Sequence, residues 1–517
     1  MLNISKVQFG ELDARNEVFQ QSRNDSMVFF NSYQIPPGVN FDSILSGSKY
    51  FITGQKGTGK TALIWYLKHR IEEYKGHAEI VLFKSDLTEA ERQHIASLTD
   101  TNIFVDQGKI SIQYDYKQNW LWFIIRTISK MLEYDDLDFG KESLHDLKEL
   151  TGVNKKNKQT IFSGLQFTKI RVAIETAIKT GVFKSGIKGE LEAIYSKKDS
   201  SIIDIISMCE QELINLKVKD RRRYCLLFDE LELFLNKVDQ RDRDLALIRD
   251  LLYAVSRINR KFGTNNSITI YASVRSEVLQ EVNRIGPEIR RDVSDFGAEV
   301  LWNINSQSSS QPILNIVEAK IQASELENGL KQTADVWDTY LPKILFGKNI
   351  KQYLLDISMY KPRNLVRRLK LAQAAHYNEG SLISDDFSDS AQTFSSDVWS
   401  EIEEDLLSSY TPMQVSCIKS ILSGFQVKFN LSSLKERIER LSRIDVNIST
   451  NIRGCIDAAK IAYDLYRVGA IGNVYRLDSE NRHEGRDRWV FRNYLEPLLD
   501  KDFIIHESLR KNFQLLR

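Results

Sequence analysis

Apolar runs of strand length alternate with helical apolar spacing between residues 49 and 305. The runs are rich in aromatic and β-branched residues, which favour strands. Strands are predicted at residues 49–53, 79–83, 224–228, 268–274 and 299–304. A helix that packs on the sheet is predicted to open near Tyr116, because apolar side chains fill Trp120–Ile125. This alternation is typical of a parallel sheet covered by helices on both faces, so we predict an α/β fold.

The pattern changes after residue 305, where a polar segment rich in serine and glutamine predicts a loop. Apolar spacing is then helical to about residue 380, which predicts a helical lid. Near the C-terminus, a helix is predicted at 456–466, a strand at 472–477, a polar turn at 478–486 and a returning strand at 488–492. A helix followed by a β-hairpin predicts an α+β winged-helix domain.

These changes divide the chain into four predicted segments. They are an N-terminal arm at 1–48, the sheet-containing core at 49–305, a helical lid at 306–380, and a helical linker with the winged helix at 381–517. The core carries a long helical insertion at about 117–200 that is rich in lysine, from Lys155 to Lys198. Two interpretations of the insertion stay open, a nucleic-acid contact and an ordinary solvated helix face.

Composition limits the partners and the compartment. The 517 residues are 42% hydrophobic and 27% charged, as in soluble globular proteins. Because 71 Lys and Arg balance 70 Asp and Glu, the whole chain has no cationic field for nucleic acid or anionic lipid. Apolar runs fall short of the roughly 18 residues of a membrane span and the first residues lack a signal core, so we expect a cytoplasmic protein without membrane contact. The four cysteines are widely spaced, so we expect reduced structural thiols.

A glycine-rich motif follows the first predicted strand and opens the next helix. It satisfies G-x-x-x-x-G-K-[ST], the pattern of a loop that binds nucleoside triphosphates. The candidate binding residues are Gly54, Gln55, Lys56, Gly57, Thr58, Gly59, Lys60, Thr61 and Ala62. Backbone N–H groups and the helix N-terminus attract phosphates, Lys60 adds a positive charge, and the Thr61 hydroxyl is expected to hold Mg²⁺. The alternative, a glycine-rich turn with an accidental Lys-Thr pair, is disfavoured by the flanking strand and helix.

Two carboxylates, Asp229 and Glu230, end the apolar strand at 224–228. A buried strand delivers Asp229 to the carboxyl edge of the sheet, where it can hold Mg²⁺ opposite Thr61. Glu230 points differently, which suits a base that orients the attacking water. We therefore predict ATP hydrolysis with Mg²⁺, in which Lys60, Asp229 and Glu230 are catalytic. The alternative is a helix N-terminus that follows a core strand.

The segment from Asn236 to Asp239 matches N-K-x-D, the guanine-reading motif of GTPases. Such a motif must lie at the end of its own strand to reach the base. Here it follows Glu230 by six residues, inside a charged stretch, and no D-x-x-G motif accompanies it. The sequence therefore favours ATP over GTP.

Four arginines and a serine are candidates for phosphate sensing. Ser273 or Arg275, at the end of the strand 268–274, is expected near the terminal phosphate, unless Arg275 is an ordinary solvated cation. Arg290 or Arg291 is a candidate arginine finger for a neighbouring subunit, and a helix-end cation or a local ion pair is the alternative. Arg363 lies in the first turn of a helix predicted to start at Pro362, where a ligand anion explains a cation that opposes the helix dipole.

These motifs resemble those of AAA+/STAND ATPases with the core, lid and winged-helix layout of origin-recognition-type initiators. The match extends to a bacterial P-loop ATPase family found in defence or mobile-element gene clusters, through Phe9-Gly10, Trp120, Phe228–Glu232 and Phe503–His506. The resemblance implies that Lys60 and Thr61 bind nucleotide and Mg²⁺, that Asp229 and Glu230 drive hydrolysis, and that Arg363 is the lid arginine called sensor 2. The sensor strand departs from the family, in which Asn often ends that strand.

Three functions remain open. The first is an ATP-driven switch that self-associates as a homo-oligomer and controls an effector protein, which the motifs favour. The second is a DNA-binding or DNA-remodelling ATPase whose predicted hairpin supplies cations. The candidate cations are Arg476, Arg482, His483, Arg486 and Arg488, and acidic residues interrupt them. The third, a nucleotide-bound scaffold without hydrolysis, is disfavoured by the intact Asp229-Glu230 pair.

Overall fold

The structure is a computed structural model of the chain. It describes residues 1–86, 88, 92, 102–106, 109–113, 116–153, 202–219, 222–232, 238–262, 267–286, 288–303, 311–376, 380–479, 482–492 and 494–515. The chain folds into two compact units, which are described separately. Unit 1 holds Met1–Pro37, Lys56–Gly59 and Leu301–Arg517, and unit 2 holds Gly38–Gln55 and Lys60–Val300. The lysines from Lys155 to Lys198 that defined the predicted basic insertion lie outside the described residues.

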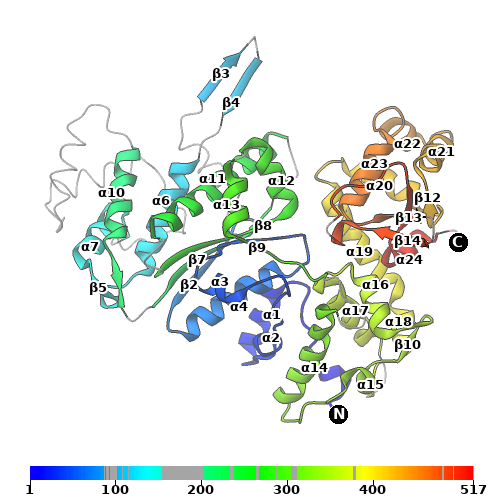
Figure 1. The fold of residues 1–517 in the computed structure, drawn as a ribbon, viewed down its shortest axis with the longest axis horizontal. Helices are drawn as coiled ribbons and strands as arrows, with labels where there is room; N and C mark the ends of the chain where they lie inside the picture. The colour runs from blue at the N-terminus through cyan, green and yellow to red at the C-terminus, as the bar shows by residue number, and fades with distance from the viewer. Residues whose placement is uncertain are drawn as a thin grey trace. The chain divides into compact units, whose positions relative to one another are not determined.

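Unit 2 contains a five-stranded parallel sheet, which confirms the predicted α/β fold (Figure 1). The strand order is β2-β7-β8-β1-β9. The strands are β1 (Phe51–Gly54), β2 (His77–Leu82), β7 (Tyr224–Leu231), β8 (Ile268–Arg275) and β9 (Gly297–Glu299). The last predicted strand, 299–304, is wrong in position, because pairing with β1 begins at Gly297 and ends with the bond from Val300 N–H to the Thr53 carbonyl. Apolar residues continue past that bond, so composition alone placed the strand too late.

Helices cover both faces of this sheet. On one face lies α4 (Lys60–Glu73), and on the other lie α6 (Lys117–Met131) and α11 (Val238–Phe262) (Figure 1). The predicted helix near Tyr116 is confirmed as α6, whose buried Trp120 contacts the ring of Phe228 on β7 at 5.9 Å between centroids. The remaining elements of unit 2 are α3 (Phe41–Leu45), β3 (Asn102–Asp106), β4 (Lys109–Gln113), η2 (Tyr134–Asp136), β5 (Leu137–Phe139), α7 (Lys141–Leu150), α10 (Ile202–Ile214), β6 (Lys217–Val218), α12 (Ser276–Ile285) and α13 (Glu288–Phe296).

In unit 1 the N-terminal residues pack against the helices that follow residue 311. The Leu2 N–H donates to the Tyr340 hydroxyl at 2.8 Å, and the Gln8 N–H donates to Ser324 Oγ at 2.9 Å. The elements are η1 (Ile4–Lys6), α1 (Ala14–Arg23), α2 (Val28–Ser32), η5 (Pro312–Leu314), α14 (Asn315–Glu327), α15 (Val336–Tyr340), β10 (Ile344–Leu345), β11 (Lys348–Asn349), α16 (Ile350–Ser358), α17 (Pro362–Ala375), α18 (Ser384–Asp389) and α19 (Ala391–Leu406). The helical character predicted to about residue 380 is present, and the four-segment division stays a prediction.

The C-terminal part of unit 1 combines helices with an antiparallel sheet of order β12-β15-β13-β14. Its elements are α20 (Pro412–Leu422), β12 (Lys428–Phe429), α21 (Leu431–Ser442), α22 (Val446–Asn451), α23 (Ala458–Arg467), β13 (Ile471–Ser479), β14 (Arg482–Arg488), η6 (Val490–Arg492), β15 (Asp502–Ile505), η7 (Glu507–Leu509) and α24 (Arg510–Phe513). The predicted polar turn at 478–486 and the returning strand at 488–492 are wrong in position, because β13 and β14 pair from Asn473–Arg488 to Ser479–Arg482. Backbone pairing at a sheet edge tolerates polar residues, whereas Val490 and Phe491 are buried in a 3₁₀ turn.

Two further expectations concern the cysteines and the membrane. All four cysteines are free thiols, and Cys209, Cys225 and Cys417 are buried while Cys455 is exposed. Burial raises the pKa of Cys225 to about 11, which keeps that thiol protonated. Among the described helices, none has the length and apolar content needed to cross a membrane.

Candidate functional site

The glycine-rich loop ends where α4 begins, and it presents Lys60 at the first position of that helix. Gly57 and Gly59 adopt φ angles of 81° and 96°, the left-handed region that glycine enters without strain. The Lys60 side chain is turned back toward the loop, where its Nζ donates to the carbonyls of Gly54 and Gln55 at 2.9 Å each. The loop therefore has the curled backbone and the helix N-terminus that phosphate binding requires.

The end of β7 is irregular at the two predicted carboxylates. The register between β7 and β8 shifts between Phe228 and Leu231, so Asp229 and Glu230 form a bulge. Asp229 is 3% exposed, whereas Glu230 is partly exposed and has a φ of 55°. A left-handed conformation at a residue other than glycine costs about 1–3 kcal/mol and is concentrated at functional sites. The bulge aims these neighbouring carboxylates in different directions.

Two buried oxygens have no hydrogen-bond partner among the described residues. They are Oδ2 of Asp229 and Oγ of Ser273. Burial raises the pKa of Asp229, although the Glu230 backbone and the nearby Ser273 and Thr61 hydroxyls act in the opposite direction. A buried carboxylate without enough donors is costly unless a cation neutralises it. Carboxylate and hydroxyl oxygens are ligands that Mg²⁺ prefers, so Asp229 and Thr61 fit the predicted metal.

Several further charged residues lie near Asp229 and Lys60. The pKa of Lys60 is lowered to about 8, because burial and the nearby positive charge of Arg275 outweigh the negative charges of Glu277, Asp229 and Glu232, which raise it. Arg275 forms an ion pair with Glu232, so the alternative of an ordinary solvated cation does not hold. Arg275 and these three carboxylates therefore lie within electrostatic interaction range of the Lys60 ammonium.

The hydroxyl of Ser85 donates to Glu230 Oε2 at 2.5 Å. Ser85 and its neighbour Lys84 follow β2, which is the strand beside β7 in the sheet. Our sequence reasoning missed four residues of the site, which are Lys84, Ser85, Glu232 and Glu277. Two signals could have found Lys84, Ser85 and Glu232, which are the carboxylate two residues after Glu230 and the polar pair at the carboxyl end of the adjacent strand.

The other predicted loop residues, Lys56–Gly59, belong to unit 1 together with Arg363. Lys56 Nζ forms ion pairs with Glu404 at 2.8 Å and with Asp405 at 3.2 Å. The Thr58 carbonyl accepts a hydrogen bond from Trp302 Nε1 at 2.8 Å.

Arg363 lies in the first turn of α17, which begins at Pro362 as predicted. Its Nε donates to the Leu12 carbonyl at 3.0 Å, and its guanidinium lies 3.5 Å from a Glu401 carboxylate oxygen. The N-terminal arm and α19 therefore supply the acceptors for this arginine within unit 1.

Arg290 and Arg291 lie on α13 and are exposed, while Ile289 and Val293 form the buried face of that helix. Within the described ranges, neither arginine makes a hydrogen bond or an ion pair, so a local ion pair does not explain them. The structure does not join them to the charges around Lys60. They are available at the surface of unit 2.

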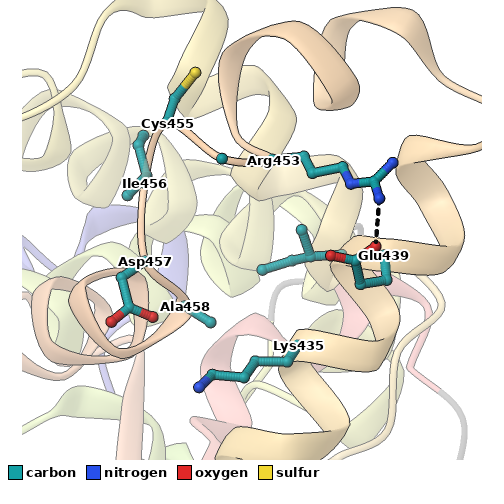
Figure 2. Close-up of a pocket in the computed structure, with 9 residues that line it drawn as sticks. Lys435, Glu439, Arg453, Cys455, Ile456, Asp457 and Ala458 are labelled. Carbon is teal, nitrogen blue, oxygen red and sulfur yellow. Dashed lines mark ion pairs between the residues drawn. The ribbon is translucent and has the colours of Figure 1, made fainter.

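A separate hollow of about 380 Å³ lies in the C-terminal part of unit 1. Figure 2 shows Arg453 pointing toward Glu439, and the two charges lie 3.2 Å apart. Asp457 caps α23 by accepting the Ala459 N–H at 3.1 Å. These charged groups satisfy one another or the backbone, in contrast to the buried oxygens of Asp229 and Ser273. The hollow is therefore a weaker candidate site than the cluster in unit 2.

A known domain family and a known protein are similar to parts of this chain. Residues 311–403 match the family model of the FunZ-associated C-terminal helical domain, which here runs from η5 into α19. The chain is also 22% identical over 276 residues to a transposon gamma-delta 80.3 kDa protein of Escherichia coli (strain K12). That alignment covers 52% of this chain but 37% of the relative. The findings indicate similarity to a mobile-element protein and give no support for the AAA+/STAND resemblance.

Proposed function

We propose that the chain is an ATP-binding and ATP-hydrolysing protein that depends on Mg²⁺. The observation that carries this proposal is the pair of buried oxygens on Asp229 and Ser273, beside Thr61 and Lys60. A glycine-rich turn of purely structural use does not require such a costly arrangement. The five-stranded parallel sheet with helices on both faces fits the same function loosely.

Each residue of the site has its own proposed role in ATP hydrolysis. Backbone N–H groups of the loop and the start of α4 bind the phosphates, and Lys60 exchanges the carbonyls of Gly54 and Gln55 for phosphate oxygens. Thr61 and Asp229 would hold Mg²⁺, which would supply positive charge to the leaving phosphates. Glu230 orients the attacking water once its carboxylate leaves the Ser85 hydroxyl. Ser273 and Arg275 contact the terminal phosphate.

Under this proposal, the site is expected to bind ATP rather than GTP. The residues Val238 and Asp239 of the N-K-x-D match open the helix α11, whereas Asn236 and Lys237 lie outside the described residues. A guanine-reading motif directly follows a strand. Here Val238 and Asp239 lie in a helix, so they do not fit that motif. No other feature of the described site favours guanine.

The wider role that we propose is an AAA+/STAND-like switch with a winged-helix domain. Nucleotide state would control self-association and an effector protein in the cytoplasm. Similarity to a transposon protein supports a mobile-element setting, and anti-phage defence is a related setting implied by the resemblance. The helical match at 311–403 supports treating that segment as a module of its own.

The proposal is tested by replacing Glu230 with Gln. The variant should bind ATP as the wild type does but turn it over about 10²–10⁴-fold more slowly, because Gln cannot act as a base. Bound nucleotide is measured with a fluorescent ATP analogue, and turnover is measured as phosphate release. Glu288→Gln makes the same charge change at an exposed position of α13 and serves as the control. Hydrolysis at the wild-type rate would remove Glu230 from its role.

A second candidate is a DNA-binding or DNA-remodelling ATPase, and the transposon similarity favours it. Arg486 is exposed on β14, whereas Arg488 is partly buried and lies over the Tyr494 ring at 5.0 Å. Arg486→Glu should therefore reduce retention on double-stranded DNA in low salt without disturbing the fold. Retention that survives the change would exclude Arg486 as the contact.

A further inference from the structure

Glu232 joins two cations at the edge of the candidate site. It follows the last residue of β7, Leu231, and its side chain is 20% exposed. One carboxylate oxygen forms an ion pair with Arg275 at the end of β8, and the other lies 3.5 Å from Lys84 Nζ after β2. A single carboxylate thus connects the ends of three adjacent strands, in the order β2-β7-β8.

The Glu232–Arg275 pair is electrostatically coupled to the phosphate loop. Arg275 lowers the pKa of Lys60 while Glu232 raises it, so both charges lie within interaction range of the Lys60 ammonium. Arg275 and Lys60 would repel one another without an anion close to both. Glu232, together with Asp229 and Glu277, supplies that negative charge in this structure.

We propose that Glu232 is a positioning residue that pairs with Arg275 until a terminal phosphate takes over that pairing. Glu232 thereby sets the preference for triphosphate over diphosphate. The inference rests on the proposed function, since it assigns Arg275 to the phosphates bound by the Lys60 loop. Arg275 cannot bind the carboxylate and a phosphate at full strength together, so Glu232 competes with the terminal phosphate for it. A diphosphate lacks the terminal group and gains less from Arg275.

The test compares Glu232→Gln with the wild type, using ADP and a non-hydrolysable ATP analogue, each with Mg²⁺. Gln keeps the shape of the side chain and removes its charge. The analogue should bind about fivefold to tenfold more tightly, whereas ADP should change less than about twofold. In an Arg275→Gln background the same Glu232→Gln change should give no gain. Glu288→Gln is the matched control for loss of one negative charge, and thermal melting verifies folding.

The outcomes separate this inference from the function on which it rests. Equal changes for the two nucleotides, weaker binding of the analogue, or a gain that persists with Arg275→Gln would each overturn the role of Glu232. If the wild type binds and Lys60→Ala does not, the nucleotide site stands whatever Glu232 does. If the wild type binds neither nucleotide, the proposed function and this inference fall together.

Discussion

Lys60 carries the most informative electrostatic feature of the molecule. Its side chain is buried, and burial together with the positive charge of Arg275 lowers its pKa to about 8. In this structure its Nζ donates two hydrogen bonds, to the backbone carbonyls of Gly54 and Gln55. The cost of burying this charge is therefore recovered when a phosphate replaces those acceptors.

Nucleotide affinity should depend on pH because of Lys60. A bound phosphate raises the pKa of Lys60 above 8, so binding above that pH requires the uptake of a proton. Affinity should be nearly constant from pH 7 to 8 and fall by up to about tenfold per unit above pH 8. Titration calorimetry in buffers of different ionisation enthalpy counts the protons taken up. Lys60→Arg, which stays charged, should remove the slope, and a wild type without a slope would contradict the assignment.

At the residue scale, local motifs nominate candidate residues that lie close together in sequence. Lys60, Thr61 and Asp229 follow from fixed spacing after a strand, so the sequence was enough to name them. Ser85 and Glu232 were missed because their roles arise from the adjacency of β2, β7 and β8, which is non-local. The bulge at Glu230 also escaped prediction, since nothing in the sequence around it requires a positive φ.

At the scale of elements, α17 is organised around a buried arginine. Arg368 is fully buried and donates to the Tyr353 hydroxyl at 2.9 Å, to Ser390 Oγ at 2.8 Å and to the Phe387 carbonyl. These acceptors come from α16, α18 and the residue before α19. One guanidinium thus ties together the helices of the segment that matches the FunZ-associated domain.

Replacing Arg368 with Ala should destabilise unit 1 strongly. The change leaves a cavity and deprives buried acceptors of their donor, so the free energy of unfolding should fall by about 3 kcal/mol or more. Urea unfolding followed by circular dichroism measures the loss. Lys343→Ala, at an exposed ion pair with Asp338, is the control and should leave the unfolding curve unchanged. If Arg368→Ala unfolds at the same urea concentration as the wild type, the hydrogen bonds of Arg368 contribute little to the free energy of unfolding.

Elements with a buried apolar face were predictable, and exposed ones were not. The residues of β7 and β8 are buried almost throughout, and their apolar runs located both strands. By contrast, β14 runs from Arg482 to Arg488 and contains no apolar residue, so the prediction moved the strand to the next apolar group at 490–491. Those apolar residues instead fill the core as a 3₁₀ turn.

At the scale of the whole molecule, the proposal of a self-assembling switch depends on the surface of unit 2. Arg290 and Arg291 are exposed there, as a residue that acts on a neighbouring subunit must be. Sequence could nominate them because they precede the last strand. It could not tell which subunit they serve, because an interface depends on a second chain.

If one of these arginines acts in trans, turnover should depend on assembly. ATP hydrolysis per chain should rise with protein concentration, and changing Arg290 and Arg291 together to Ala should remove that rise, with a loss of about 10³-fold or more at high concentration. Arg284→Ala, at an exposed position of α12 that pairs with Glu281, is the control. Turnover per chain that is independent of concentration would contradict the trans role.

If the loop at Gly54–Thr61 binds a nucleoside triphosphate with Mg²⁺, titration calorimetry of the full chain with ATP and Mg²⁺ should detect that binding. We expect one site per chain, a loss of about 100-fold or more in affinity for Lys60→Ala, and wild-type affinity for Lys68→Ala, which removes a lysine on the same helix that pairs with Glu72. Wild-type protein that takes up no nucleotide, or binding that Lys60→Ala leaves intact, would contradict nucleotide binding by this loop.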